Sequence, residues 1–283
     1  MDVGGSSPSG PTKAIEGGVV THSHSDLASL GGELLRARNA CQPAPRPSAS
    51  GWDLTVDDAY AVQAEQVRLM TRSGGRLGAI KLGLTDQAQQ DRAGWSAPSF
   101  GTLTESMLIA AGGELSLSCG IRPRVEPEIV VTLAREMTSA PESVNEFIGY
   151  VVDVRLGIEV VDPRYNDSEF ILTDALADNS SALAGVVADA GVTADSVDWF
   201  SEELTLTING EERVGGSGSA LKGGPLGIAL DAVRERIRLG LDVPKGLHIF
   251  TGNVAGKAVP VQVGDVAQVS SPSLGSVALQ IVA

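Results

Sequence analysis

The sequence of 283 residues is poor in cysteine, in aromatic side chains and in long apolar runs. Its two cysteines, Cys41 and Cys119, lack the CxxC spacing of a thiolate zinc site. Their scarcity argues against a disulfide framework and suits a reducing cytoplasm. No run of about 18 apolar residues occurs, so no segment is expected to span a bilayer. We therefore expect a cytoplasmic protein.

Positive charge is also scarce, because 21 basic residues stand against 35 acidic residues and give a net charge of −14. Such a surface repels a phosphate backbone, so nucleic acid is not expected as a partner. Hydrophobic residues make up 42% and charged residues 20% of the chain, as in an ordinary globular protein.

Three regions differ in texture along the chain. Residues 1–25 are rich in Gly, Ser and Pro and lack the apolar core of a signal peptide, which predicts a disordered tail. Residues 26–75 have helical apolar spacing and predict an N-terminal helical lobe. Residues 76–283 alternate short apolar runs with Gly, Pro, Asp and Asn, which predicts a β-rich domain.

Helices are expected at three places. The lobe should contain one helix over residues 27–40 and another over residues 54–70, the second capped by Thr55. One helix, at about residues 227–239, should interrupt the β-rich region.

The sharpest chemical signal is the segment RPRVEPEIVVTLA, in which Glu126 and Glu128 are two residues apart. On a strand both side chains point to one face. The apolar neighbours indicate an interior strand, where two facing carboxylates repel unless a divalent cation compensates. An alternative is a solvated face on which the glutamates pair with Arg122 and Arg124. Pro127 between them indicates an edge strand or a bulge.

Two more charged residues lie inside apolar runs. Glu159, in RLGIEVVD, is costly to bury unless it pairs with an arginine such as Arg155 or Arg164, or binds a metal. Lys81, in LGAIKLGLTD, could balance the carboxylates, bind a substrate or move a proton. Three oxygen ligands, with the histidines and cysteines elsewhere, favour Mg²⁺ or Mn²⁺.

Together these segments resemble the hydratase/decarboxylase branch of the fumarylacetoacetate hydrolase superfamily, which includes 2-hydroxypenta-2,4-dienoate hydratases and 4-oxalocrotonate decarboxylases. The resemblance covers nearly everything after residues 1–25. It implies an α+β fold, a mixed β-roll or sandwich with an N-terminal helical lobe. It also implies a homo-oligomer that could associate with a paralogous hydratase. Its segments are LTVDDAYAVQ, KLGLTDQAQQ, FGTLTESM, RPRVEPEI, GIEVVDPRYNDSEFILTDALADNSS and VPVQVGDVAQVSSPSLGSVALQIV.

The resemblance also implies the residues of the active site. It places Mg²⁺ or Mn²⁺ on Glu126, Glu128 and Glu159, and a catalytic lysine at Lys81. Substrate contacts are expected from the ADN loop, through Asp178, Asn179 and Ser181, and from the Thr251-Gly252 turn, through Thr251.

Three features depart from the family pattern. Family members usually carry Gly-His-Pro before the last helix, whereas this chain has KGGP, with Gly224 in the histidine position. The helix then reads IALDAVRERI in place of an Ala-Trp-Leu stretch. Hydratases tend to have an acidic residue before Phe100, where this chain has Ser99. The last change, with the decarboxylase-like segment DPRYNDSEFILTDALADN, favours a decarboxylase.

The resemblance therefore implies a metal-dependent carbon–carbon lyase of aromatic catabolism, which decarboxylates an unsaturated 2-oxo dioic acid such as 4-oxalocrotonate to a 2-hydroxydienoate. The cation would act as a Lewis acid on the C2 oxygen, and Lys81 would hold the substrate or supply a proton. A 2-hydroxypenta-2,4-dienoate-type hydratase, a carbon–oxygen lyase, is the closest alternative. An acylpyruvate-type hydrolase would need an acid–histidine pair. A non-catalytic subunit that stabilises an active paralogue is the alternative from another class.

Overall fold

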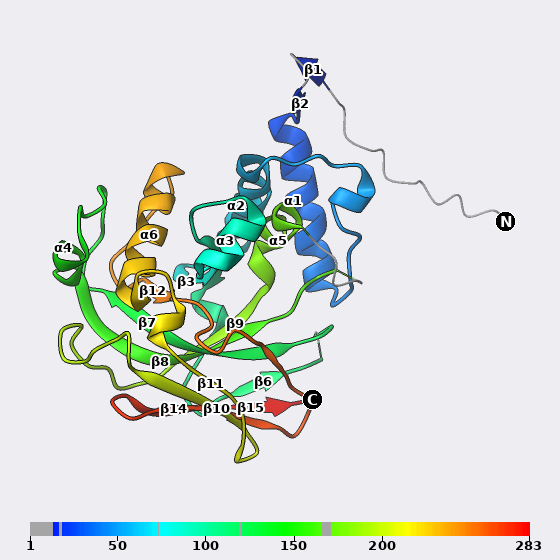
Figure 1. Cartoon of the computed structure of the whole chain (residues 1–283). Helices are drawn as coiled ribbons and strands as arrows, with labels where there is room; N and C mark the ends of the chain where they lie inside the picture. Colours follow the sequence, from blue (N-terminus) through cyan, green and yellow to red (C-terminus); the bar gives the residue numbers. More distant parts are fainter. Residues whose placement is uncertain (1–13, 17–18, 73, 119, 166–170) are drawn as a thin grey trace.

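A computed structural model of the chain describes residues 14–16, 19–72, 74–118, 120–165 and 171–283. Helices cover one side of a large curled sheet, and a smaller sheet packs against its other side (Figure 1). This is the α+β arrangement that the sequence predicts. Part of the expected tail, residues 1–13 and 17–18, lies outside the described residues; next to it, β1 (Ala14–Glu16) and β2 (Val19–Thr21) pair antiparallel.

The predicted helical lobe consists of α1 (His24–Asn39) and α2 (Val56–Thr71), with a short 3-10 turn, η1 (Ser48–Ser50), between them. Thr55 caps α2 as predicted, since its hydroxyl accepts the third backbone N–H of the helix in a capping box. A Cβ on Gly31 of α1 would lie 2.7 Å from a backbone carbonyl of α2. The glycine that weakens α1 therefore allows the two helices to pack closely.

Two buried glutamines of α2 attach the lobe to the rest of the molecule. The Gln63 amide donates to the backbone carbonyls of Phe100 and Leu176, at 2.9 and 3.1 Å. The Gln66 amide donates to the carbonyl of Ala177 at 2.5 Å. These bonds satisfy carbonyls beside the predicted substrate loop, so the lobe helps to fix that loop.

The larger sheet has the strand order β4-β3-β12-β7-β8-β9-β5, with β13 also paired to β7. Its neighbours are antiparallel, except for the parallel pairs β3–β12 and β5–β9. The strands are β3 (Leu77–Gly83), β4 (Ser99–Thr104), β5 (Leu108–Ile109), β7 (Arg124–Leu133), β8 (Val151–Val161), β9 (Ala182–Val187), β12 (His248–Phe250) and β13 (Val259–Pro260), with the 3-10 turn η2 (Glu105–Met107) after β4.

The smaller sheet has the order β11-β10-β14-β15-β6 and packs against β7, β8 and β9. One face of β8, with Val154, Leu156, Ile158 and Val160, is fully buried in the core that the two sheets share. Because side chains alternate along a strand, Glu159 points to the opposite face, toward the helices. The strands are β6 (Glu114–Ser116), β10 (Glu203–Ile208), β11 (Glu211–Ser217), β14 (Val266–Ser271) and β15 (Gly275–Val282).

The predicted helix at residues 227–239 is α6 (Gly224–Arg238), which follows the 3-10 turn η4 (Gly218–Ala220). Gly224, in the family's histidine position, has φ 70°, a left-handed conformation that favours glycine. The expectation that one helix interrupts the β-rich region is wrong. Three short helices of five to seven residues carry too little periodicity to be recognised; they are α3 (Gln87–Ala93), α4 (Val144–Ile148) and α5 (Leu172–Ala177).

Pro127 lies inside β7 rather than on an edge strand, where it pairs with Ile158 of β8. On the other side of β7, β12 pairs with residues 130–132 and β13 with residues 124–125, which leaves a gap between them. The Pro127 carbonyl accepts the Val254 N–H at 3.4 Å from the loop that fills this gap. The missing N–H of the proline therefore faces a loop and costs no ladder hydrogen bond.

Cys41 is disulfide-bonded in the structure, which contradicts the expectation drawn from the cysteine spacing. Spacing along the chain does not report which segments meet in space, and Cys119 lies outside the described residues. None of the described helices has the length and apolar content needed to cross a membrane.

Candidate metal centre and substrate cavity

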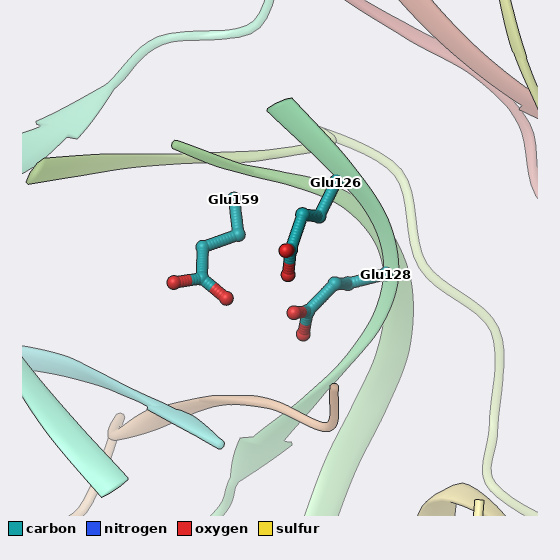
Figure 2. Close-up of side chains that lie close together, drawn as sticks. All are labelled: Glu126, Glu128 and Glu159. Carbon is teal, nitrogen blue, oxygen red and sulfur yellow. The ribbon is translucent and has the colours of Figure 1, made fainter. Parts of the chain in front are cut away.

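Strands β7 and β8 bring three carboxylates to one point. Glu126 and Glu128 alternate on β7, and Glu159 lies directly opposite Glu126 on β8. Residues two apart share a face, as do directly opposed residues, so all three side chains converge (Figure 2). One oxygen from each carboxylate lies within 4.8 Å of the other two. The structure thus assembles the predicted ligand set.

This carboxylate cluster, Glu126, Glu128 and Glu159, is poorly satisfied by the protein. Glu128 and Glu159 are fully buried, and Glu126 is half-buried. One oxygen of Glu128 accepts the Gly252 N–H at 2.7 Å. Within the described part of the chain, Glu128 Oε1 and Glu159 Oε2 have no hydrogen-bond partner. Buried oxygens without partners are costly, and this points to a missing ligand.

Arg155 and Arg164, which could have neutralised the carboxylate cluster, form ion pairs with other residues. Arg155 binds Asp153 at 2.6 Å, and Arg164 binds Asp162. The interpretation of Glu126 and Glu128 as a solvated strand face does not hold either, since Glu128 is completely buried. Among the described residues, Glu159 forms no ion pair with Arg155 or Arg164.

Lys81 on β3 is the cation that meets the cluster. Its Nζ lies 3.0 Å from Glu159 Oε1, and its side chain is buried. Burial alone lowers the pKa of Lys81, but Glu159, Glu126 and Glu128 outweigh this effect and raise it. Three carboxylates against one ammonium leave two negative charges, which one divalent cation would neutralise.

The pKa values of the glutamates show the cost of this surplus. Burial, followed by repulsion from Glu159, raises the pKa of Glu126 to about 7. The same two causes raise the pKa of Glu128 well above its ordinary value. A set of carboxylate oxygens with two surplus charges fits a hard divalent cation such as Mg²⁺ or Mn²⁺.

The turn after β12 positions Glu128. Gly252, which donates to Glu128, has φ 109°, and a Cβ there would lie 2.5 Å from the Thr85 side chain. The hydroxyl of the predicted substrate residue Thr251 donates to the Ile129 carbonyl at 2.8 Å. The side chain of Thr251 therefore holds the turn. Gly252 has the more direct role, because its N–H fixes one ligand oxygen.

The predicted substrate loop is a left-handed turn. Asn179, Ser180 and Ser181, which form the 3-10 turn η3 (Asn179–Ser181), have φ values of 53°, 51° and 58°. Non-glycine residues in this region each cost about 1 kcal/mol or more, so the surroundings must hold the turn. The Asn179 carboxamide accepts the Thr102 N–H at 2.7 Å and donates to the Thr102 carbonyl at 2.8 Å. Asn179 is thus used to fix the turn to β4.

Asp178, at the start of this turn, also binds the protein's own backbone. Its carboxylate accepts the Arg164 N–H at 2.9 Å. Burial raises the pKa of Asp178 to about 7, although Arg164 and Arg38 oppose the rise. Arg38 of α1 donates to the Ala182 and Leu183 carbonyls, which ties the lobe to the same turn.

A cavity of about 880 Å³ opens beside the carboxylate cluster. Of the predicted site residues, Lys81, Glu126 and Ser181 line it, and Val56 of α2 contributes a wall from the lobe. Another cavity, of about 1140 Å³, lies next to His248 and α6 and contains none of the predicted site residues. The chemistry therefore belongs to the smaller cavity.

Comparison with known proteins places this architecture in a family. The model of the fumarylacetoacetate hydrolase C-terminal domain matches residues 64–282, so the chain belongs to the fumarylacetoacetate hydrolase family. Within it, the relatives named below place the chain in the hydratase/decarboxylase branch, as the resemblance implied.

Two curated relatives and one solved structure define that branch. A 2-keto-4-pentenoate hydratase of Paraburkholderia phymatum is 32% identical over 253 residues, 89% of this chain and 95% of the relative. A 4-oxalocrotonate decarboxylase of Pseudomonas putida is 30% identical over 230 residues, 81% of this chain and 87% of the relative. The structure of 4-oxalocrotonate decarboxylase from Pseudomonas putida G7, complexed with magnesium and adipate, superposes with a TM-score of 0.87 at 27% identity and covers 93% of this chain and 99% of that one.

Proposed function

We propose that this protein is a divalent-metal-dependent decarboxylase of an unsaturated 2-oxo dioic acid like 4-oxalocrotonate. The observation that carries the proposal is the buried carboxylate cluster, with partnerless oxygens and two surplus negative charges. Glu126, Glu128 and Glu159 would hold Mg²⁺ or Mn²⁺. The similar decarboxylase structure, which is complexed with magnesium and adipate, supports both a divalent ion and a dicarboxylate ligand.

A bound cation would supply Lewis acidity toward the C1 carboxylate and C2 carbonyl oxygens of a 2-oxo acid. The residues around it supply positioning. Lys81, anchored 3.0 Å from Glu159 and exposed to the cavity, would hold the anionic head of the substrate or give a proton to the product. The hydroxyl of Ser181 on the cavity wall would donate to the substrate. Cleavage of the bond to the distal carboxylate releases CO₂ and sends the electron pair through the conjugated chain toward the C2 oxygen.

The lining of the cavity supports decarboxylation over hydration. A hydratase must activate water near the distal carbons, for which a general base is needed. Among the described residues that line the cavity, Glu126 is the single carboxylate, and it is a proposed metal ligand. Ser99, which stands where hydratases tend to have an acid, is buried and lines the same cavity. The described lining therefore offers no carboxylate as a general base besides this metal ligand.

Hydration remains the second candidate because several relatives of about the same similarity carry hydratase names. A non-catalytic subunit is less favoured. A scaffold gains nothing from a buried cluster of like charges, which costs stability. We also propose, on the resemblance alone, a homo-oligomer that could associate with a paralogous hydratase, a cytoplasmic location and a role in aromatic catabolism.

The test is turnover by the metal-stripped protein with and without Mg²⁺. The substrates are 2-oxohex-3-enedioate and, separately, 2-hydroxypenta-2,4-dienoate, followed by CO₂ release and by loss of dienol absorbance. Mg²⁺-dependent CO₂ release from the first is the expected result. Consumption of the second compound alone would make the protein a hydratase. No turnover of either compound, by the parent or by the Glu128→Gln variant, would favour the non-catalytic subunit.

A further inference from the structure

The cavity carries positive charge that the metal centre does not use. The chain has a net charge of −14, yet Lys81, Arg92, Arg122 and Arg124 line this cavity, and Glu126 is the single carboxylate among its described lining residues. Lys81 is already paired with Glu159. One divalent cation would neutralise the rest of the carboxylate cluster. Arg92 and Arg124 are therefore left for a second anionic group.

Arg124 is placed by the same strand that carries two of the metal ligands. Arg124, Glu126 and Glu128 are two residues apart on β7, so their side chains leave the strand on one face. Two residues of strand span about 7 Å, which is the length of a short carbon chain. A molecule that starts at the metal centre and follows β7 to its beginning would meet the Arg124 guanidinium.

Arg124 and Arg92 are available to a ligand. Both are exposed, and neither makes a hydrogen bond or an ion pair with the residues that the structure describes. Arg124 acts on the protein at a distance, because its charge opposes the rise in the pKa of Glu126 that burial causes. Arg92 lies in the last turn of α3 and also lines the cavity. Arg122 differs, since its guanidinium donates to the Tyr165 carbonyl at 2.9 Å and is held at the wall.

The remaining wall suits the hydrocarbon part of such a ligand. Apolar residues from several separate segments line the cavity, among them Leu84, Ala93, Val161, Leu172 and Ala258. The cavity thus offers a metal-binding end, apolar lining residues and the guanidinium groups of Arg124 and Arg92. This combination of features suits an acid with a 2-oxo carboxylate at one end and a second carboxylate at the other.

We propose that Arg124, assisted by Arg92, is the specificity-determining residue that binds the distal carboxylate of a 2-oxo dicarboxylate substrate. The inference rests on the proposed function, in which the 2-oxo end lies at the metal centre. Loss of CO₂ removes the negative charge that the guanidinium holds, so the ion pair stabilises bound substrate and not product. Arg124 therefore acts on substrate affinity, and its removal raises KM without lowering kcat.

A matched pair of ligands isolates the distal carboxylate. Binding of 2-oxoadipate and 2-oxohexanoate, which have the same chain length and differ in that group, is measured by calorimetry on the Mn²⁺-loaded protein. The variants are Arg124→Gln and Arg92→Gln. Arg213→Gln, on β11 and outside the cavity, controls for the change in net charge. The Mn²⁺ affinity of each variant is measured first.

The parent is expected to bind 2-oxoadipate roughly tenfold more tightly than 2-oxohexanoate, because 2-oxohexanoate lacks the carboxylate that would accept a charged hydrogen bond. Arg124→Gln should abolish this difference and leave the Kd values for Mn²⁺ and 2-oxohexanoate unchanged, whereas Arg213→Gln should change nothing. In turnover, Arg124→Gln should raise KM for 2-oxohex-3-enedioate with kcat undiminished.

Two results would overturn the inference while leaving the proposed function intact. One is equal binding of the two acids by the parent. The other is weaker Mn²⁺ binding by Arg124→Gln with the preference for 2-oxoadipate retained, which would make Arg124 a residue that tunes Glu126. Failure of both acids to bind the Mn²⁺-loaded parent would instead contradict the proposed function, and the inference would fall with it.

Discussion

At the scale of single residues, Glu128 shows how the site is built. The Gly252 N–H fixes one of its oxygens, and the other, Glu128 Oε1, has no hydrogen-bond partner among the described residues. Burial raises the pKa of Glu128, and the repulsion from Glu159 adds to it. Function and stability therefore oppose each other at this position, as is common at active sites.

Glu128→Gln should separate these two effects. The amide keeps an oxygen for the Gly252 N–H and removes one of the repelling charges. We expect the metal-free variant to be more stable than the metal-free parent by about 1 kcal/mol or more in urea unfolding. Its Mn²⁺ affinity should fall by roughly 100-fold or more, since a ligand is lost. A variant that is less stable and binds Mn²⁺ as the parent does would make Glu128 a structural residue.

Lys81→Met gives the complementary result. The substitution removes the one ammonium that pairs with Glu159, at 3.0 Å, and keeps an apolar stem of similar length. We expect kcat/KM to fall about 100-fold or more, as for loss of a positioned proton donor or substrate-binding cation. Mn²⁺ should still bind, because the three carboxylates remain. Weaker Mn²⁺ binding, with full turnover at saturating Mn²⁺, would contradict the assignment.

At the scale of elements, the left-handed turn of residues 179–181 forms part of the cavity wall through Ser180 and Ser181. Asn179 holds it by pairing with both backbone groups of Thr102, and the Ser180 hydroxyl donates to the Phe100 carbonyl at 3.0 Å. Ser181 then faces the cavity. The strain in the turn is balanced by these bonds to β4.

Asn179→Ala should therefore be strongly destabilising. It leaves the Thr102 N–H and carbonyl unpaired in the interior and places alanine in the left-handed region. We expect a loss of about 2 kcal/mol or more in urea unfolding. Ser180→Ala removes one hydrogen bond and should cost about 1 kcal/mol. Equal effects of the two substitutions would show that the carboxamide of Asn179 does not hold the turn.

Particular elements show how far the sequence alone reaches. The cap at Thr55 and the alternation along β7 follow from local chemistry, so α2 and the shared face of Glu126 and Glu128 are predictable. The position of Glu159 opposite Glu126 depends on the register of two strands about 30 residues apart, which no local pattern encodes. It was expected from the family resemblance. Short helices such as α4 cannot be predicted from the sequence, because about one and a half turns are too few to show an apolar period.

The roles of the loop residues were harder still to predict. The family motif placed Asp178, Asn179 and Thr251 near the substrate, but their polar atoms bind neighbouring backbone groups. Whether a carboxamide turns inward or outward depends on the position of β4, a distant segment. Direct contact of these three side chains with substrate stays a prediction.

At the scale of the whole molecule, buried Asp178 links stability to pH. Its pKa is about 7 in the folded protein against an ordinary value of 3.8. Between these values the folded chain holds a proton that the unfolded chain has lost. The stability contribution of Asp178 is thus fully present below pH 3.8 and is lost as the pH rises to about 7.

Asp178→Asn should remove this dependence. The amide oxygen still accepts the Arg164 N–H, and no charge has to be buried. We expect the unfolding free energy of the metal-free variant to change less with pH between 4 and 7 than that of the metal-free parent. At pH 8 the variant should be the more stable of the two. Parallel curves for the two proteins would show that Asp178 is ionised throughout this range.

One measurement tests the central claim, that three glutamates on β7 and β8 form a metal site for a 2-oxo acid. Mn²⁺ is titrated into the metal-stripped parent and into the Glu126→Gln, Glu128→Gln and Glu159→Gln variants, with free Mn²⁺ followed by electron paramagnetic resonance. The account predicts one saturable Mn²⁺ per parent chain, roughly 100-fold or more weaker binding in each variant, and a changed spectrum of bound Mn²⁺ when 2-oxohexanoate is added to the parent. No saturable binding to the parent, or equal binding to all four proteins, would contradict it.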